Sequence, residues 1–219
     1  MTKHYGIYEK HTKRILDFII SLICIVVLAP VMFLIAILVR KKLGKPIIFA
    51  QQRPGYKEQI FNLYKFRSMT DARDKNGNLL PETQRLTPFG NFIRSTSLDE
   101  LPELFNILKG EMSFVGPRPL VVSYLQYYTE SERKRHDVKP GLTGWAQANG
   151  RNSLTWEKRF EYDVYYAEHI SFWLDIKTIF KTIKCVLLKS DIGIPGKGVM
   201  IDFSEYRKQQ LSKEKHEKQ

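Results

Sequence analysis

An uncharged segment near the N-terminus constrains the fold of this chain more than any other feature. It runs from Phe18 to Val39 and, at about 22 residues, is long enough for one helix to cross a bilayer. Few soluble helices are apolar on every side over such a length. The segment therefore predicts a membrane-embedded helix rather than a buried helix of a soluble protein.

The flanks and the centre of this segment argue against a simple crossing. Basic residues stand on both sides of it, namely Lys10, Lys13 and Arg14 before it and Arg40, Lys41, Lys42 and Lys45 after it. Because positive charge favours the cytoplasmic face, both ends are expected there. Pro30 removes a backbone donor near the middle and predicts a sharp bend. We predict a re-entrant helix-break-helix within residues 1–42, with an ordinary kinked transmembrane helix as the alternative.

The rest of the chain is long enough for one further folded unit. The protein has 219 residues, of which 43% are hydrophobic, and a formal net charge of +12. We expect a single domain over residues 43–203 and a charged, disordered tail over residues 204–219. The net charge requires an anionic partner, for which nucleic acid, an anionic leaflet and a phosphorylated substrate are all candidates. Cys24 and Cys185 have the spacing of neither a disulfide framework nor a zinc site, which favours a reducing, cytosolic setting.

Residues 175–190 predict an amphipathic helix with a cationic back. Its apolar face comprises Ile176, Ile179, Phe180, Ile183, Val186 and Leu187, and its polar face carries Lys177, Lys181 and Lys184. With the interfacial aromatics Phe172 and Trp173 just before it, we expect this helix to lie in the headgroup region of a membrane. A core-packing helix with solvated lysines is the alternative.

An alternating pattern predicts a strand over Phe61–Met69, with Lys65 and Arg67 on the same face as apolar residues. A lysine beside buried apolar groups is costly unless an anion meets it, so Lys65 is a candidate phosphate contact. A solvated lysine on an edge strand is the alternative. Residues 71–88 predict a turn-rich excursion, and a helical stripe of leucines begins at Leu98.

The acidic pair Asp99-Glu100 stands at the start of that stripe, in a chain that is otherwise cationic. Ser97-x-x-Glu100 matches a capping box, which would make Glu100 structural. Pro102 favours a helix that begins later, so both carboxylates would sit at its entrance, where backbone donors lower their pKa. An ionised Asp99 is a usable nucleophile towards phosphorus, and Glu100 could hold Mg²⁺. The local pattern leaves catalysis and capping both open.

The remaining segments supply further candidates. Arg118 lies in the stiff turn Gly116-Pro117-Arg118-Pro119 and, with Lys65 and Arg94, could neutralise transition-state charge. We expect one helix from about Leu120 to Arg135 and another over Trp156–Glu168, which carries Asp163. The loop 141–151 combines glycines with Gln147 and Arg151, a composition suited to close approach of a ligand.

Four motifs together resemble the bacterial sugar transferase family, the monotopic phosphoglycosyl transferases, over about residues 13–191. They are Lys65-Phe66-Arg67-Ser68-Met69, Ser97-Leu98-Asp99-Glu100-Leu101-Pro102, Phe114-Val115-Gly116-Pro117-Arg118-Pro119 and Lys139-Pro140-Gly141-Leu142-Thr143-Gly144-Trp145-Ala146-Gln147. The compact length is similar to that of the minimal members. The resemblance implies a helix-rich α/β fold with a re-entrant membrane helix, interfacial amphipathic helices and a small catalytic region on the cytoplasmic face.

The resemblance also implies a two-step reaction that begins glycoconjugate assembly, whether of exopolysaccharide, capsule, O-antigen or N-glycan. Asp99 would attack the β-phosphorus of a UDP-sugar, release UMP and carry a phosphosugar, which undecaprenyl phosphate then accepts. Glu100 would bind Mg²⁺, and Lys65, Arg94 and Arg118 map near the phosphates. Asp163, Gln147 and Arg151 are further candidates for substrate binding.

One departure from the family pattern is visible at the membrane bend, where the usual Ser-Pro is replaced by Ala29-Pro30. Two other functions compete with the transferase: a nucleic-acid-binding protein and a non-catalytic membrane scaffold. We expect no nucleic acid as partner, because the aromatic residues are not interleaved with basic residues on one strand face. No segment is typical of one particular sugar, and the oligomeric state is open.

Overall fold

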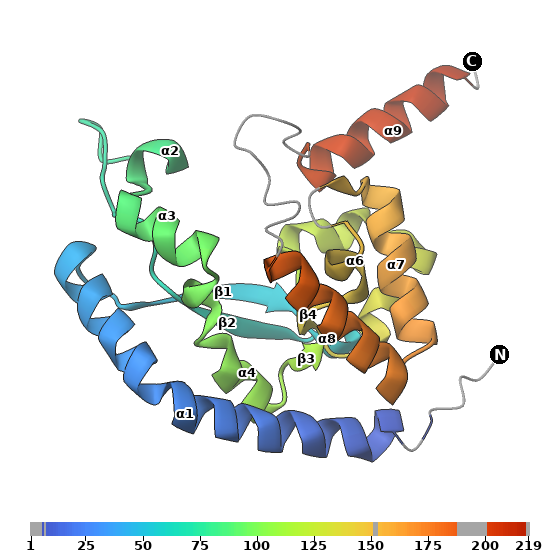
Figure 1. The fold of residues 1–219 in the computed structure, drawn as a ribbon. Helices are drawn as coiled ribbons and strands as arrows, with labels where there is room; N and C mark the ends of the chain where they lie inside the picture. Colours follow the sequence, from blue (N-terminus) through green and yellow to red (C-terminus); the bar gives the residue numbers. More distant parts are fainter. Residues whose placement is uncertain (1–5, 7, 151–152, 188–200, 218–219) are drawn as a thin grey trace. The chain divides into compact units, whose positions relative to one another are not determined.

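The computed structural model describes residues 6, 8–150, 153–187 and 201–217, and Figure 1 shows the arrangement of its elements. The chain divides into two compact units. The first comprises Met1–Ile15, Gln52–Phe61 and Glu111–Gln219, and the second comprises Leu16–Gln51 and Asn62–Gly110. The limits predicted from the sequence, at residues 42 and 203, do not separate these units. The helix-rich α/β class predicted from the sequence is confirmed.

Helix α1 spans Lys13–Lys42 and continues through Pro30 without interruption. Figure 1 draws it as one bent helix, so the predicted break in the helix is replaced by a bend within it. Within the described residues, α1 is the helix that is long and apolar enough to cross a membrane, judged by length and composition. The membrane topology of α1 stays a prediction.

The C-terminal part of α1 contributes to the core of the second unit. Ile35, Val39 and Leu43 pack with Phe66 and Ile93. Large apolar side chains nearer the N-terminus of α1 stay exposed, including Ile23, Val26, Val27 and Phe33. The same helix therefore has one end committed to the protein core and a long stretch whose apolar surface is available to lipid.

A two-stranded sheet, β1 (Ile48–Pro54) and β2 (Ile60–Phe66), follows α1, and both strands pass from one unit into the other. The second unit continues with α2 (Glu82–Arg85), α3 (Pro88–Ser95), the 3₁₀ turn η3 (Leu98–Glu100) and α4 (Glu103–Lys109). Thr87 begins α3, because its side chain accepts a hydrogen bond from the amide of Gly90. The strand ends three residues before the predicted limit. The α-helix begins at Glu103, which confirms the later start predicted from Pro102.

In the first unit, the short strands β3 (Ser113–Val115) and β4 (Gly141–Thr143) pair in parallel, with Ser113 opposite Gly141 and Val115 opposite Thr143. Backbones approach very closely at the ends of these strands. A Cβ atom on Gly116 would lie 2.3 Å from the carbonyl oxygen of Lys139. A residue with a side chain would therefore push the Gly116–Pro119 turn away from the strand pair.

The first unit also contains six short helices: η1 (Tyr8–Thr12), η2 (Tyr56–Glu58), η4 (Val122–Tyr127), α5 (Glu130–Arg133), η5 (Lys134–Asp137) and α6 (Trp145–Ala148). The single helix predicted for residues 120–135 is wrong, since η4, α5 and η5 replace it. Thr129 explains the interruption, because it forms a capping box with Glu132. An N-cap residue requires extended backbone angles, so the chain leaves the helix at Tyr128 and a new helix starts.

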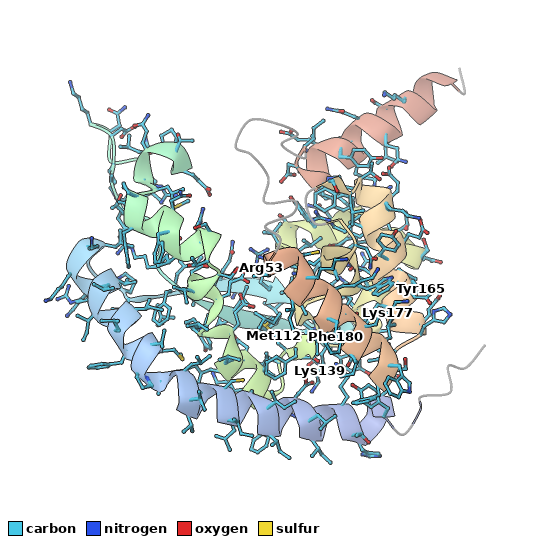
Figure 2. All side chains as sticks on the ribbon, in the orientation of Figure 1. Arg53, Met112, Lys139, Tyr165, Lys177 and Phe180 are labelled. Carbon is cyan, nitrogen blue, oxygen red and sulfur yellow. The ribbon has the colours of Figure 1, made fainter. Side chains whose placement is uncertain are left out.

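Two longer helices complete the first unit, α7 (Trp156–Glu168) and α8 (Phe172–Leu187). The bounds predicted for α7 are confirmed, and Thr155 caps it through the amide of Lys158. On α8, Trp173, Phe180, Ile183 and Val186 are exposed. The ammonium groups of Lys177 and Lys181 lie 5.5 and 4.6 Å from the centre of the Trp145 ring, and Figure 2 labels Lys177 and Phe180 on this helix. Part of the predicted apolar face is thus exposed, at Phe180, Ile183 and Val186, whereas Ile179 packs against the core around Val115. The helix combines an exposed apolar surface with core packing, and its place in the headgroup region stays a prediction.

The C-terminal segment is helical, where we predicted disorder. Helix α9 spans Phe203–Glu217. Phe203 is 0% exposed and packs with Leu120, Tyr128, Trp156 and Phe160. The charged composition of residues 204–219 suggested disorder, but the helix begins one residue earlier, at Phe203, and this buried ring anchors it to the core.

Candidate active site

The acidic pair lies beside the predicted lysine within the second unit. The Lys65 ammonium on β2 lies 2.5 Å from Glu100 Oε1 and 3.1 Å from Glu103 Oε1. Glu103 is buried, and the side chains of Lys65 and Glu100 are about four-fifths buried. Lys65 is therefore a partly buried cation held between two carboxylates, not a solvated lysine of an edge strand. To bind a further anion, the Lys65 ammonium must share its contacts with Glu100 and Glu103 or give one of them up.

Asn106 explains why β2 and α4 hold this geometry. Its side chain accepts a hydrogen bond from the amide of Tyr64 at 3.1 Å and donates one to the carbonyl of Asn62 at 2.7 Å. The amide group thereby imitates the edge of a neighbouring strand. Because Asn106 is 0% exposed, α4 is fixed to the strand that carries Lys65, and the ammonium and the carboxylates stay in register.

The capping interpretation of the acidic pair is wrong. Ser97 has φ 56° and ψ 18°, a left-handed conformation, and no cap hydrogen bond is found for its side chain in the described part of the chain. The pair follows in the 3₁₀ turn η3, ahead of the α-helix that begins at Glu103. A serine in this conformation is uncommon and costs free energy, and such positions cluster at functional sites. The strained turn directly precedes the candidate nucleophile.

Asp99 is buried, with 7% of its surface exposed. Burial raises the pKa of Asp99, Lys65 and Arg94 oppose that rise, and the neighbouring charge of Glu100 adds to it. We predicted a lowered pKa from backbone donors at a helix entrance, and this prediction is wrong because desolvation outweighs them. The nearby cations are thus what favours the ionised carboxylate against the cost of its burial.

Arg94, on α3, is the second predicted cation of this unit. Its Nε donates to the Ser68 hydroxyl at 2.9 Å, and the side chain is otherwise exposed. Gly90 permits this contact, because a Cβ atom there would lie 1.8 Å from the Ser68 carbonyl oxygen. The guanidinium is anchored at one nitrogen near the acidic pair. By contrast, Arg67 is buried and committed to Asp71 at 2.6 Å, so it serves the fold.

The residues present fit a magnesium ion. Among residues 8–150, 153–187 and 201–217, no group of three or more His, Cys, Asp or Glu side chains forms a ready-made metal site. Mg²⁺ in proteins usually takes one or two carboxylates and completes its shell with water and substrate phosphates. The hard oxygens of Asp99 and Glu100 match that donor set, and an added cation would relieve the repulsion between them.

The other predicted site residues lie in the first unit. Arg118 is half-buried in the turn after β3. Asp163 is buried and pairs with Arg135, whose Nη2 lies 2.7 Å from its carboxylate. Gln147 donates to the Leu142 carbonyl at 3.3 Å, while its Oε1 is buried without a hydrogen-bond partner among the described residues. Arg151 lies outside the described residues.

Sequence reasoning missed two arginines near Arg118. Arg135 is 2% exposed and donates to the Arg118 carbonyl at 2.8 Å. Arg159 precedes Asp163 by one helical turn, and its pKa is lowered by burial, with the charges of Arg118 and Arg135 adding to the effect and Asp163 opposing it. The signal for both was weak, since single arginines inside a basic cluster and inside a predicted helix look like solvated surface.

The structure thus brings together Lys65, Arg94, Asp99 and Glu100 in one unit. It brings together Arg118, Arg135, Arg159 and Asp163 in the other. Each group contains cationic side chains near one or two carboxylates. One group carries the candidate nucleophile, and the other carries an excess of guanidinium groups.

Comparison with known proteins places these motifs in a family. A model of the family described as bacterial sugar transferase matches residues 8–189. The sugar transferase EpsL of Bacillus subtilis is 55% identical over 162 residues, which cover 74% of this chain and 80% of that protein.

Two longer relatives carry activity names. The UDP-glucose:undecaprenyl-phosphate glucose-1-phosphate transferase of Klebsiella pneumoniae is 42% identical, over 78% of this chain and 39% of that protein. The undecaprenyl-phosphate galactose phosphotransferase of Salmonella typhimurium is 38% identical, over 82% of this chain and 41% of that protein. The match spans about two fifths of the length of these two relatives. On the extent of the family match and the identity to EpsL, this chain belongs to the bacterial sugar transferase family and is a transferase.

Proposed function

We propose that this protein transfers a sugar-1-phosphate from a UDP-sugar to undecaprenyl phosphate and releases UMP. One observation carries the proposal: Asp99 is a buried acid that interacts electrostatically with the cations Lys65 and Arg94, in a chain whose relatives are named for undecaprenyl-phosphate sugar transfer. The product, a polyprenyl diphosphate sugar, would begin a glycoconjugate.

In the proposed first step, an Asp99 carboxylate oxygen attacks the β-phosphorus of the UDP-sugar. The bond from that phosphorus to the bridging oxygen breaks, and UMP leaves with the bonding electron pair. Asp99 then carries the sugar phosphate as a mixed anhydride. Lys65 and Arg94 would neutralise charge on the phosphoryl oxygens as it develops.

In the proposed second step, a phosphate oxygen of undecaprenyl phosphate attacks the phosphorus held on Asp99. The acyl phosphate bond breaks, and the aspartate is regenerated as a carboxylate. Arg118 would orient the phosphates through its planar fork of donors. Lys65 and Arg94 favour the ionised state of Asp99. Starting from that state, Asp99 neither gains nor loses a proton in either step.

Glu100 and Asp99 would hold the magnesium ion. When bound, Mg²⁺ would screen the charge of the diphosphate and so lower the repulsion that the carboxylate meets as it approaches. In this structure the Lys65 ammonium lies 2.5 Å from Glu100 Oε1. We therefore expect the ammonium to turn from Glu100 towards a phosphate when metal and donor are bound.

The membrane elements would bring the lipid acceptor to this chemistry. The exposed apolar surface of α1 suits the acyl region, and the exposed face of α8, with Trp173 and Phe180, suits the interface. We propose that both ends of α1 lie on the cytoplasmic face, since basic residues flank its apolar stretch on both sides.

A donor screen tests the reaction. Purified protein in detergent would receive undecaprenyl phosphate, Mg²⁺ and a panel of UDP-sugars, and UMP would be measured. We expect UMP release with one or few donors, and only with both acceptor and metal for sustained turnover. Asp99→Asn should abolish turnover, whereas Asp74→Asn, which changes an exposed turn residue, should leave it intact. Turnover by Asp99→Asn at the wild-type rate would refute the nucleophile.

Topology needs a separate test. In a variant with Cys24 and Cys185 replaced, single cysteines at Gly6 and Lys42 would be labelled with a membrane-impermeant reagent. We expect both to react from the cytoplasmic side. Labelling of the two positions from opposite sides would show an ordinary transmembrane crossing instead.

A further inference from the structure

The turn that carries Arg118 is held at its first end by a phenol of α7. The Tyr166 hydroxyl lies 2.9 Å from the carbonyl oxygen of Val115, the residue just before Gly116. Tyr166 is 1% exposed, and Val115 is equally buried. A buried hydroxyl on a buried carbonyl is a strong directional restraint, because breaking it leaves polar groups without water to replace the bond.

The other end of the turn is held by a buried ion pair. Arg135 Nη2 donates to the Arg118 carbonyl at 2.8 Å, and the same nitrogen lies 2.7 Å from Asp163 Oδ2. Arg135 Nε donates to that carboxylate oxygen at 3.1 Å. Tyr128 and Phe160 cover the guanidinium, each with its ring centre 5.7 Å away. Asp163 therefore orients Arg135, and Arg135 orients the backbone of Arg118.

Both restraints come from one face of one helix. Asp163 and Tyr166 are three residues apart on α7, a spacing that places side chains next to each other on a helix surface. Thr155 caps that helix, and its buried aromatic residues fix its position in the core. Helix α7 thus reaches the Val115 carbonyl directly, through Tyr166, and the Arg118 carbonyl indirectly, through the pairing of Asp163 with Arg135.

We propose that Tyr166, Asp163 and Arg135 are positioning residues that hold the Arg118 side chain in its working orientation. The inference rests on the proposed function, in which Arg118 meets the substrate phosphates. It reassigns Asp163, which the sequence placed among candidates for substrate binding. Its carboxylate is engaged by Arg135 and is not exposed to a ligand.

Stability alone is a weak reason for this arrangement. A buried ion pair can often be replaced by apolar residues of similar size without loss of stability, because both charges were desolvated on folding. The Arg135–Asp163 pair donates a hydrogen bond to the Arg118 carbonyl, and apolar residues could not make that bond. It sets the direction of a backbone segment whose side chain must meet a phosphate to within a fraction of an ångström.

The Tyr166 hydroxyl has a second neighbour, which defines how it should be removed. It lies 2.6 Å from Asp175 Oδ1, and Asp175 also accepts from Lys13 at 2.5 Å and from Tyr8 at 2.7 Å. The hydroxyl has one proton for two acceptors, the Val115 carbonyl and Asp175 Oδ1, so Tyr166→Phe removes both contacts. Asp175 keeps Lys13 and Tyr8 as donors. Tyr165→Phe is the matched control, since Tyr165 is the adjacent phenol on α7 and is 44% exposed.

The test is a double-mutant cycle on the full chain. Two changes are made: Tyr166→Phe, and the paired change Arg135→Met with Asp163→Leu, which removes both members of the buried ion pair together. Each is made with Arg118 and with Arg118→Lys. UMP release gives kcat and KM, and thermal unfolding identifies folded variants. With Arg118 we expect kcat/KM to fall about tenfold or more in both variants, mainly through kcat, and to be unchanged in Tyr165→Phe. With Arg118→Lys the same changes should have a much smaller effect.

A second measurement does not need activity. Gly116 donates its amide to the Thr143 carbonyl at 2.9 Å, so hydrogen exchange of a peptide covering residues 116–118 reports opening of the turn. Exchange should quicken in Tyr166→Phe and in the paired variant but not in Tyr165→Phe.

Three results would overturn the inference or its basis. Equal fold losses with Arg118 and Arg118→Lys would show that these residues act on the fold alone. Unchanged exchange in folded variants would show that they do not restrain the turn. Wild-type kcat/KM in folded variants that keep Arg118 would refute positioning directly. Wild-type kcat/KM in Arg118→Lys and in Arg118→Ala would instead remove Arg118 from the proposed function, and the inference with it.

Discussion

Replacing Phe203 by alanine tests the finding that the C-terminal segment belongs to the folded core. Phe203 is 0% exposed and lies among five aromatic rings. The distances between ring centres are 4.9 Å to Phe160, 5.1 Å to Trp156, 5.3 Å to Tyr124, 5.4 Å to Tyr128 and 6.4 Å to Tyr127. The substitution would remove a whole ring from this cluster.

The cost follows from burial and geometry. Truncation of a fully buried phenylalanine to alanine costs about 3–5 kcal/mol, which includes the cavity that remains. The many favourable ring contacts place Phe203 towards the upper part of that range. For a chain of this size, each kcal/mol lowers the midpoint of thermal unfolding by about 2–4 °C. The expected shift is therefore roughly 6–20 °C.

Thermal and guanidinium unfolding in one detergent, followed by tryptophan fluorescence, would measure this loss. Trp156 reports directly, because its ring lies in the cluster. Leu211→Ala is the control, since Leu211 lies on the same helix, α9, and is 49% exposed. It should change the free energy of unfolding by less than about 0.5 kcal/mol. If Phe203→Ala were as stable as Leu211→Ala, the docking of α9 through Phe203 would be wrong.

Two further predictions concern the pH dependence of stability and the strained turn. Burial lowers the pKa of His136 to about 3, whereas the unfolded chain takes up this proton near pH 6.5, so stability should fall as the pH drops through that window. Between pH 7 and pH 4.5 the loss from this group is roughly 2–3 kcal/mol, and guanidinium midpoints of His136→Gln should be correspondingly less sensitive to pH. Ser97→Gly should raise stability by about 0.5–1 kcal/mol, because glycine accepts the left-handed backbone without strain. Ser95→Gly, at the last residue of α3, should lower stability because Ser95 has helical backbone angles. A loss of stability in Ser97→Gly would contradict the strain argument.

Local patterns predicted the elements whose signals lie close together in the chain. Helix α7 has helical periodicity and an N-cap at Thr155, and its bounds were confirmed. The predicted 120–135 helix failed because a second cap, at Thr129, begins a new helix inside an acceptable periodic pattern. Helical periodicity is a property of many consecutive residues, whereas an N-cap depends on one residue. The periodic pattern over residues 120–135 therefore gave no sign of the new helix start after Thr129.

The candidate site was predicted in its residue types and only partly in its geometry. Lys65, Asp99 and Glu100 were identified from charge in an unusual context, and the structure places Lys65 against Glu100. The direction of the Asp99 pKa was wrong, because burial depends on residues distant in the chain. Arg135 was missed, since its partner Asp163 is 28 residues away and no local pattern marks such a pair.

The sequence by itself determined the apolar character of α1, the order of the family motifs and the side chains able to handle phosphate, because composition and short-range spacing need no knowledge of distant contacts. The tertiary structure alone decided which of those charges are buried, which carboxylate each cation meets and which carbonyls α7 holds. The physical reason is that desolvation and hydrogen-bond geometry depend on every neighbour of a group. Those neighbours come from segments that only folding brings together.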